Sequence, residues 1–219
     1  MNIIKIVVVD DHGILREGLH LLIEQQDDMQ MVDEAADGRE AVEVVRKLRP
    51  DIVLMDVSMP GLNGIEATRQ ILRESPETKV LALSAYSNKR FVIDMLKVGA
   101  SGYMLKDSLT DELIRAIRAV VAGQQYLCPK VAAIVVEDYL HGGKREPDGP
   151  LMDRLTGKER ELLQLLVENK SSKEAARLLH VSIKTVDGRR RDLMNKLGMS
   201  GIAELTKFAI REGLTSVEF

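Results

Sequence analysis

Short apolar runs alternate with longer amphipathic stretches over the first 122 residues, and this pattern predicts alternating strands and helices. The run IVLM in the third predicted strand has no polar alternation, which is typical of a strand covered on both faces. Repeated strand–helix units favour a parallel sheet. We therefore predict an α/β fold with a doubly wound, five-stranded parallel sheet. Its strands are expected near 3–9, 30–35, 51–55, 79–83 and 101–104.

The pattern changes after Gly123. The segment PKVAAIVVEDYL at 129–140 predicts a linker helix with proline in its first turn. The glycine, proline and charge content of HGGKREPDGP at 141–150 predicts a hinge loop. No strand pattern follows it. The sequence thus predicts a first domain at 1–122, a linker at 123–150 and an all-α domain at 151–219.

Helix-start signals divide the last domain into four helices. Thr156 with Glu159, and Ser171 with Glu174, have the spacing of capping boxes, in which each side chain satisfies a backbone N–H of the other residue. Ser182 is placed to cap a third helix, and Gly198 to end it. The predicted helices are 157–168, 172–179, 182–197 and 202–211.

Composition and charge narrow the class of protein. No apolar run approaches the roughly 18 to 20 residues of a membrane span, so we expect a cytoplasmic protein without membrane contact. The single cysteine, Cys128, is expected to pack in the core, and the four histidines lack metal-ligand spacing. Residues 1–150 carry 18 Lys and Arg against 24 Asp and Glu, whereas 151–219 carry 13 against 10. An acidic first part and a mildly basic second part suggest different partners.

Polar residues follow four of the five predicted strands. Asp10 and Asp11 follow the first strand, Asp56 the third, Ser84 the fourth and Lys106 the fifth. Because ligands bind at the carboxyl ends of the strands in such sheets, we expect these side chains to converge there.

These residue types suit a metal and a phosphoryl group. Carboxylates are the ligands that Mg²⁺ prefers, and a carboxylate such as Asp56 is able to attack a phosphoryl group as nucleophile. An ammonium at Lys106 and a hydroxyl at Ser84 would stabilise the phosphoryl oxygens. Taken singly, each residue is as well explained as a turn, cap or surface residue. Their joint occurrence at successive strand ends favours the site.

With these signatures in hand, residues 1–122 resemble a bacterial response-regulator receiver domain, which has a flavodoxin-like fold. The resemblance implies that Asp56 accepts phosphate from a histidine kinase, and that Mg²⁺ is held by Asp11, Asp56 and the main-chain carbonyl of Ser58, with Asp10 helping through water. It also makes Tyr103 the switch aromatic, which turns inward as Ser84 moves to the phosphate. Lys106 is followed by Asp107, as is common in the NarL/FixJ subgroup.

The segment from Leu155 to Gly201 resembles a LuxR-type helix-turn-helix, in which 182–197 is the recognition helix that enters the major groove of DNA. Helical spacing supports this independently. One face of the helix carries Val186, Leu193 and Leu197, whereas the opposite face carries Lys184, Gly188, Arg191 and Asn195.

The residues expected to meet DNA have different roles. Arg191 is expected to pair with a guanine, and Lys184 and Arg189 with phosphates. Arg189 stands where the family usually has histidine, and Gly188 stands where a side chain usually contacts a base, so the base preference is expected to differ. The carboxylates of Asp187 and Asp192 oppose phosphates unless one of them accepts a hydrogen bond from a cytosine amine. The full expected set is Lys184, Thr185, Asp187, Gly188, Arg189 and Arg191.

These features predict a two-component transcription factor that is not an enzyme beyond its own phosphorylation and dephosphorylation. The resemblance implies that the last helix, 202–211, pairs two copies on paired half-sites of duplex DNA, and we expect phosphorylation to favour the homodimer. Two alternatives stay open. One is an aspartate-nucleophile phosphohydrolase, although Ser58 stands where such enzymes have a second acid. The other is a phospho-switched module that binds protein or RNA.

Overall fold

The computed structural model describes residues 3–85, 87–140, 151–212 and 214–215. The chain forms two compact units, Met1–Gly142 and Gly143–Phe219, which are described separately. The predicted hinge at 141–150 lies outside the described residues. Within the described ranges, no helix is both long and apolar enough to cross a membrane.

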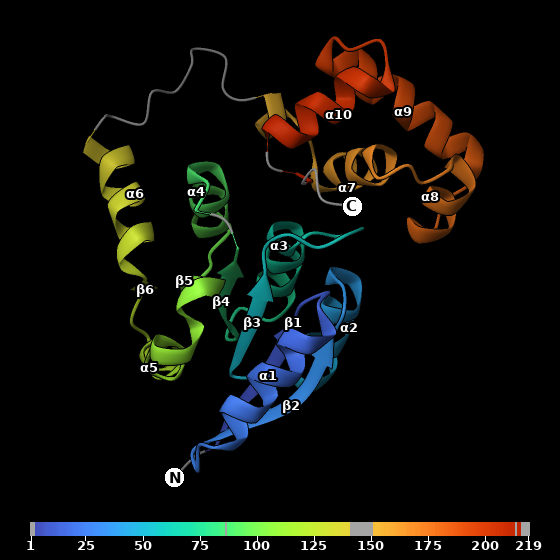
Figure 1. Cartoon of the computed structure of the whole chain (residues 1–219). Helices are drawn as coiled ribbons and strands as arrows, with labels where there is room; N and C mark the ends of the chain where they lie inside the picture. Colours follow the sequence, from blue (N-terminus) through green and yellow to red (C-terminus); the bar gives the residue numbers. More distant parts are fainter. Residues whose placement is uncertain (1–2, 86, 141–150, 213, 216–219) are drawn as a thin grey trace. The chain divides into compact units, whose positions relative to one another are not determined.

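The first unit is built on a parallel sheet (Figure 1). The strand order is β2-β1-β3-β4-β5-β6, and every neighbouring pair is parallel. The chain therefore leaves from β1 to one side and returns to β3 on the other, as in a doubly wound sheet. The strands are β1 Ile4–Val9, β2 Met29–Ala35, β3 Ile52–Asp56, β4 Lys79–Ser84, β5 Gly102–Leu105 and β6 Tyr126–Leu127.

Helices cover both faces of this sheet. Alternate residues of each central strand point to opposite faces, so Val53 and Met55 join one apolar cluster whereas Ile52 and Leu54 join the other. Four helices contribute residues to the first cluster: α2 Gly38–Leu48, α3 Gly64–Glu74, α4 Lys89–Lys97 and α6 Pro129–Leu140. Two helices contribute residues to the second cluster: α1 Gly13–Glu24 and α5 Leu109–Val121. A 3₁₀ turn at Lys106–Ser108 precedes α5.

The sixth strand is a feature that the sequence did not predict. Tyr126–Leu127 pairs with Gly102 and Tyr103 of β5, and Cys128 N–H donates to Tyr103 O at 3.2 Å. Two residues are too few to establish a period of two in the sequence. The pairing covers the edge of β5 and leads directly into the predicted linker helix, α6, where Val131 is fully buried.

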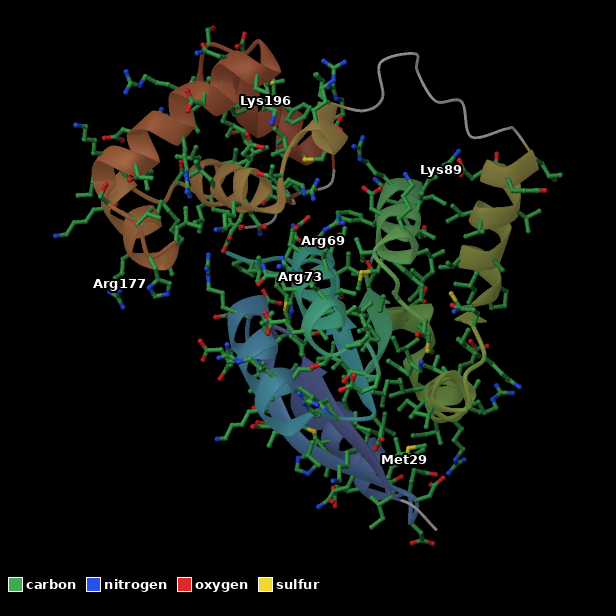
Figure 2. The ribbon with its side chains drawn as sticks, turned by 180° about the vertical axis from the view of Figure 1, so that it is seen from behind. Met29, Arg69, Arg73, Lys89, Arg177 and Lys196 are labelled. Atoms are coloured by element: carbon green, nitrogen blue, oxygen red, sulfur yellow. The ribbon has the colours of Figure 1, made fainter. Side chains whose placement is uncertain are left out.

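The second unit is helical, as predicted. It contains a 3₁₀ turn at Leu151–Arg154, then α7 Gly157–Val167, α8 Ser172–Leu178, α9 Ile183–Leu197 and α10 Ile202–Arg211. Its core combines leucines of α7 with Ala175 of α8, Val186 and Leu193 of α9 and Phe208 of α10. Lys196 of α9, labelled in Figure 2, also reaches Glu159 of α7, with 2.9 Å between Nζ and Oε2.

The predicted helix caps are present. Thr156 with Glu159, and Ser171 with Glu174, each form both hydrogen bonds of a capping box. Ser182 Oγ accepts from the backbone N–H of Thr185 at 3.1 Å, and α9 ends at Gly198, which has a positive φ of 66°. These local signals define the start of three helices and the end of the third.

Glycine is required at position 64, the first residue of α3, because the backbone of Asp56 packs directly against it. A Cβ there would lie only 1.9 Å from the carbonyl oxygen of Asp56. We expect Gly64→Ala to lower the free energy of unfolding by at least about 2 kcal/mol, because backbone must move to admit the methyl group. Gly18→Ala in α1 is the matched control, since a Cβ there meets nothing within 4 Å. Equal effects of the two substitutions in urea unfolding would contradict the packing seen here.

Candidate functional site

The parallel sheet brings the predicted polar residues to one edge. Asp10 follows β1 directly, Asp56 is the last residue of β3, Ser84 is the last of β4 and Lys106 follows β5. Asp10, Asp56 and Ser84 are almost fully buried, whereas Asp11 and His12 are exposed. The buried carboxylates thus lie beneath a solvent-facing rim.

Lys106 joins the two buried carboxylates. Its Nζ lies 2.6 Å from Asp10 Oδ2 and 2.9 Å from Asp56 Oδ2. The other oxygen of Asp56 accepts from the backbone N–H of Ser58 at 3.2 Å. One ammonium facing two carboxylates leaves a net negative site that suits a cation.

The environment of Asp56 disfavours its charge. Burial, together with the negative charge of Asp10, raises the pKa of Asp56 to about 6, although Lys106 acts in the opposite direction. Burial acts to lower the pKa of Lys106, but the carboxylates of Asp56 and Asp10 outweigh it, and the net shift is upward. Lys106 is therefore a permanent cation at neutral pH.

The carboxylates fit a divalent cation. Ligand atoms of Asp10, Asp11, His12 and Asp56 all lie within 4.8 Å of one another. Three of these four groups offer the hard oxygen atoms that Mg²⁺ prefers. A bound cation would also offset the repulsion between Asp10 and Asp56, which Lys106 balances only in part. The donor set therefore fits the Mg²⁺ that the sequence predicts.

Tyr103 is fully buried in this structure. Burial raises the pKa of its hydroxyl to about 12, while a side-chain hydrogen bond with Ser84 acts to lower it. Leu127, Cys128 and Val131 belong to the same apolar cluster or pack against it. The aromatic ring thus already lies inward, linked to Ser84 and covered by the β6–α6 segment.

Two further residues support the carboxylates, and sequence reasoning gave neither a role here. The imidazole Nδ1 of His12 lies 2.8 Å from Asp11 Oδ1 and 3.1 Å from Asp10 Oδ1. Arg16 Nη1 donates to the backbone carbonyl of Asp10 at 2.7 Å, and its Nε lies 3.3 Å from Glu34. The adjacency of His12 to the aspartates was a usable signal. The contact of Arg16 depends on how α1 packs, which a single sequence does not reveal.

The raised pKa of Asp56 has a consequence for stability. The folded state binds the Asp56 proton more tightly than the unfolded state does, so the protonated carboxyl group stabilises the fold. This contribution to the free energy of unfolding is fully present below pH 3.8 and is lost as the pH rises through about 6. In chelator, we expect Asp56→Asn to raise the free energy of unfolding at pH 7.5 by on the order of 1–3 kcal/mol, and to change it little at pH 4.

Urea unfolding at the two pH values checks this prediction. Exposed Asp27 provides the matched control, because Asp27→Asn removes one carboxylate from the same unit without touching the site. An Asp56→Asn protein that keeps the pH dependence of the wild type would contradict the assignment.

The candidate DNA-binding residues lie on α9. Val186, Leu193 and Leu197 are buried in the core of the second unit. On the opposite face, Lys184 and Arg191 are exposed and Gly188 is partly exposed. Asp187, which is exposed, and Thr185 and Arg189, which are partly exposed, lie between the two faces.

Three of these residues have hydrogen-bond partners within the unit. Ser172 Oγ donates to Asp187 Oδ1 at 2.8 Å, which ties the start of α8 to α9. The Thr185 hydroxyl lies 2.8 Å from that of Ser182, within the helix cap. Arg191 Nε donates to the backbone carbonyl of Asp187 at 3.4 Å. The capping and bridging contacts orient the exposed face of the helix.

With both sites described, comparison with known families identifies the class. Residues 6–118 match the response regulator receiver domain, and residues 153–209 match the bacterial regulatory proteins of the luxR family. The chain belongs to the NarL/FixJ-type response regulators, a family of transcription factors that join these two domains.

Individual relatives support this over nearly the whole chain. The oxygen regulatory protein NreC of Staphylococcus carnosus is 36% identical over 213 residues, which cover 96% of this chain and 98% of that protein. A crystal structure of a LuxR-family two-component response regulator from Aurantimonas is 39% identical, with a TM-score of 0.61, and covers 64% of this chain and 99% of its own. A structure of RcsB dimers bound to DNA is 26% identical, with a TM-score of 0.58. The match covers 94% of this chain and 98% of the RcsB chain.

Proposed function

We propose that Asp56 accepts a phosphoryl group from a histidine kinase and that this modification controls DNA binding by the second unit. The observation that carries the proposal is the position of Lys106, whose ammonium lies within 3 Å of carboxylate oxygens of both Asp10 and Asp56. A fixed cation beside a carboxylate nucleophile is what transfer of a charged phosphoryl group requires.

The chain's own residues have distinct roles in this step. A carboxylate oxygen of Asp56 attacks phosphorus, the bond from phosphorus to the kinase's histidine nitrogen breaks, and that nitrogen takes up a proton. Lys106 then pairs with a phosphoryl oxygen, and the Ser84 hydroxyl donates to another. Asp10, Asp11, Asp56 and the carbonyl of Ser58 would hold Mg²⁺, which when bound neutralises charge that develops on the phosphoryl oxygens.

The output side of the proposal concerns DNA. We propose that Lys184 and Arg189 contact phosphates and that Arg191 reads a base. Thr185, Asp187 and Gly188 complete the proposed surface that faces DNA. The DNA-bound dimers of RcsB support DNA binding by a homodimer of this chain. We propose that the homodimer forms on paired half-sites when Asp56 is phosphorylated. A regulator with this output acts on chromosomal DNA, and so in the cytoplasm.

The domain limits remain part of the proposal. We propose a receiver domain at 1–122, a linker at 123–150 and a DNA-binding domain at 151–219, with signal passing through the linker. The contacts of α6 support this role, because Lys89 of α4 lies 2.8 Å from Asp138 (Figure 2 labels Lys89) and Lys130 lies 3.2 Å from Asp107. Both ion pairs join the linker helix to segments that follow Ser84 and Lys106.

Selection of bound sequences from random duplex DNA, with and without a small phosphodonor and Mg²⁺, tests the function. We expect an enriched, twofold-symmetric site whose recovery increases with the phosphodonor, and binding that weakens steeply with salt. Absence of any enriched duplex would favour a module that binds protein or RNA. Steady turnover of a generic phosphate ester, faster than loss of the protein's own phosphoryl group, would favour a phosphohydrolase.

A further inference from the structure

Gly188 is a glycine that the fold does not need. It lies in the middle of α9, and it is absent from the described glycines that have a positive φ. A Cβ at this position would meet nothing within 4 Å, whereas at Gly64 or Gly38 it would collide with backbone. Glycine in a helix interior costs conformational entropy relative to alanine. Neither backbone conformation nor packing within the chain therefore accounts for it.

Gly188 lies between two exposed basic residues on the face of α9 that is predicted to contact DNA. Lys184, one turn before it, and Arg191, one turn after it, are both exposed on this face. Neither side chain fills the space above Gly188, since no atom of either lies within 4 Å of the site of its Cβ. A gap thus separates two cations on the face predicted to meet DNA.

Two side chains near Gly188 are engaged in hydrogen bonds with other groups. The Asp187 carboxylate is bonded to Ser172 of α8, and Arg191 Nε is bonded to the carbonyl of Asp187. The peptide groups around Gly188 lie inside the helix and use their hydrogen bonds there. The surface presented at the gap is therefore C–H, without a donor or acceptor of its own.

An apolar gap on a recognition helix has one matching group in the major groove. Each base edge there presents hydrogen-bond donors or acceptors, and only thymine adds an apolar group, the 5-methyl. Building on the function proposed above, we propose that Gly188 is a specificity-determining residue whose gap takes a thymine methyl group, beside the base read by Arg191.

The proposal predicts a methyl exchange across the interface. The probe is the duplex selected by the wild-type protein, with each thymine replaced in turn by deoxyuridine, which lacks only the methyl group. At one position in each half-site, we expect the wild type to bind about fourfold more weakly to the uracil duplex. We expect Gly188→Ala to bind the thymine duplex at least about fivefold more weakly, because two methyl groups then compete for one space.

The decisive combination is Gly188→Ala with the uracil duplex, where the alanine methyl replaces the missing one. Its affinity should return to within about twofold of the wild type on thymine, a coupling that independent effects do not produce. The thermal midpoint of Gly188→Ala should rise, which shows that the variant folds. Gly18→Ala, a mid-helix glycine with equally open space in the first unit, should leave all these affinities unchanged.

The outcomes separate this inference from the function on which it rests. A wild-type protein that selects a duplex, yet shows the same response to every uracil substitution as Gly188→Ala, overturns the role of Gly188 and leaves the proposed function intact. A selected site that has no thymine near the guanine read by Arg191 would likewise overturn the role of Gly188 and leave the proposed function intact. A wild-type protein that selects no duplex overturns both.

Discussion

Asp56→Asn is expected to abolish uptake of a phosphoryl group from acetyl phosphate in the presence of Mg²⁺. The amide keeps the size of the side chain and its place at the end of β3, but it lacks the nucleophilic carboxylate oxygen. Intact-protein mass measurement should show one added phosphoryl group on the wild type and none on the variant. Circular dichroism should be the same for both, since the substitution removes a charge rather than a packing contact.

Two further variants sharpen this result. Asp27→Asn, which removes an exposed carboxylate just before the amino end of β2 and so at the edge of the sheet opposite the site, should be phosphorylated like the wild type. Lys106→Ala should slow phosphorylation on the order of 10²-fold, because it removes the cation 2.9 Å from Asp56 that stabilises the developing charge. Phosphoryl uptake by Asp56→Asn at the wild-type stoichiometry would show that another residue is the acceptor.

Arg191→Ala is expected to have the largest single effect on DNA recognition. A bidentate contact between an arginine and a guanine discriminates by about 1–3 kcal/mol, so affinity for the selected site should fall about 5- to 150-fold. Discrimination should relax at one position of each half-site and stay unchanged elsewhere. Competition binding against duplexes with single substitutions measures both effects.

Lys184→Ala provides the contrasting case. A phosphate contact carries no sequence information, so this variant should bind all duplexes more weakly by a similar factor. The slope of log affinity against log salt should become less steep by about 1 for each phosphate that the variant no longer neutralises. If Arg191→Ala instead weakens all duplexes equally, with a change in salt slope, then Arg191 contacts phosphate and the base is read by another residue.

The sequence was most informative where local rules act alone. Buried runs without polar alternation predicted the central strands, and the capping-box pairs at Thr156 and Ser171 predicted the starts of two helices that the structure contains. Residues at successive strand ends predicted that Asp10, Asp56 and Lys106 would meet, because parallel strands end at one edge. In each case a short segment of sequence carries the pattern, and the fold class determines where its residues lie.

Features that depend on packing between distant segments were not accessible in this way. The pairing of Tyr126–Leu127 with β5 depends on where α5 ends, and it converts the edge around Tyr103 into a buried one. The hydrogen bond between Ser172 and Asp187 joins two residues that are 15 positions apart, so a carboxylate expected to face DNA also connects α8 to α9. The contact of Arg16 with the Asp10 carbonyl likewise follows from the placement of α1.

The central claim is that phosphorylation at Asp56 controls DNA binding, and a single titration tests it directly. Fluorescence anisotropy with the selected duplex measures the affinity of the wild type and of Asp56→Asn, each with and without acetyl phosphate and Mg²⁺. The account predicts that the phosphodonor tightens binding by the wild type about 5- to 150-fold, the usual range of coupling between two sites, and leaves Asp56→Asn unchanged. Equal affinities of the wild type under the two conditions, or an equal response of Asp56→Asn, would contradict it.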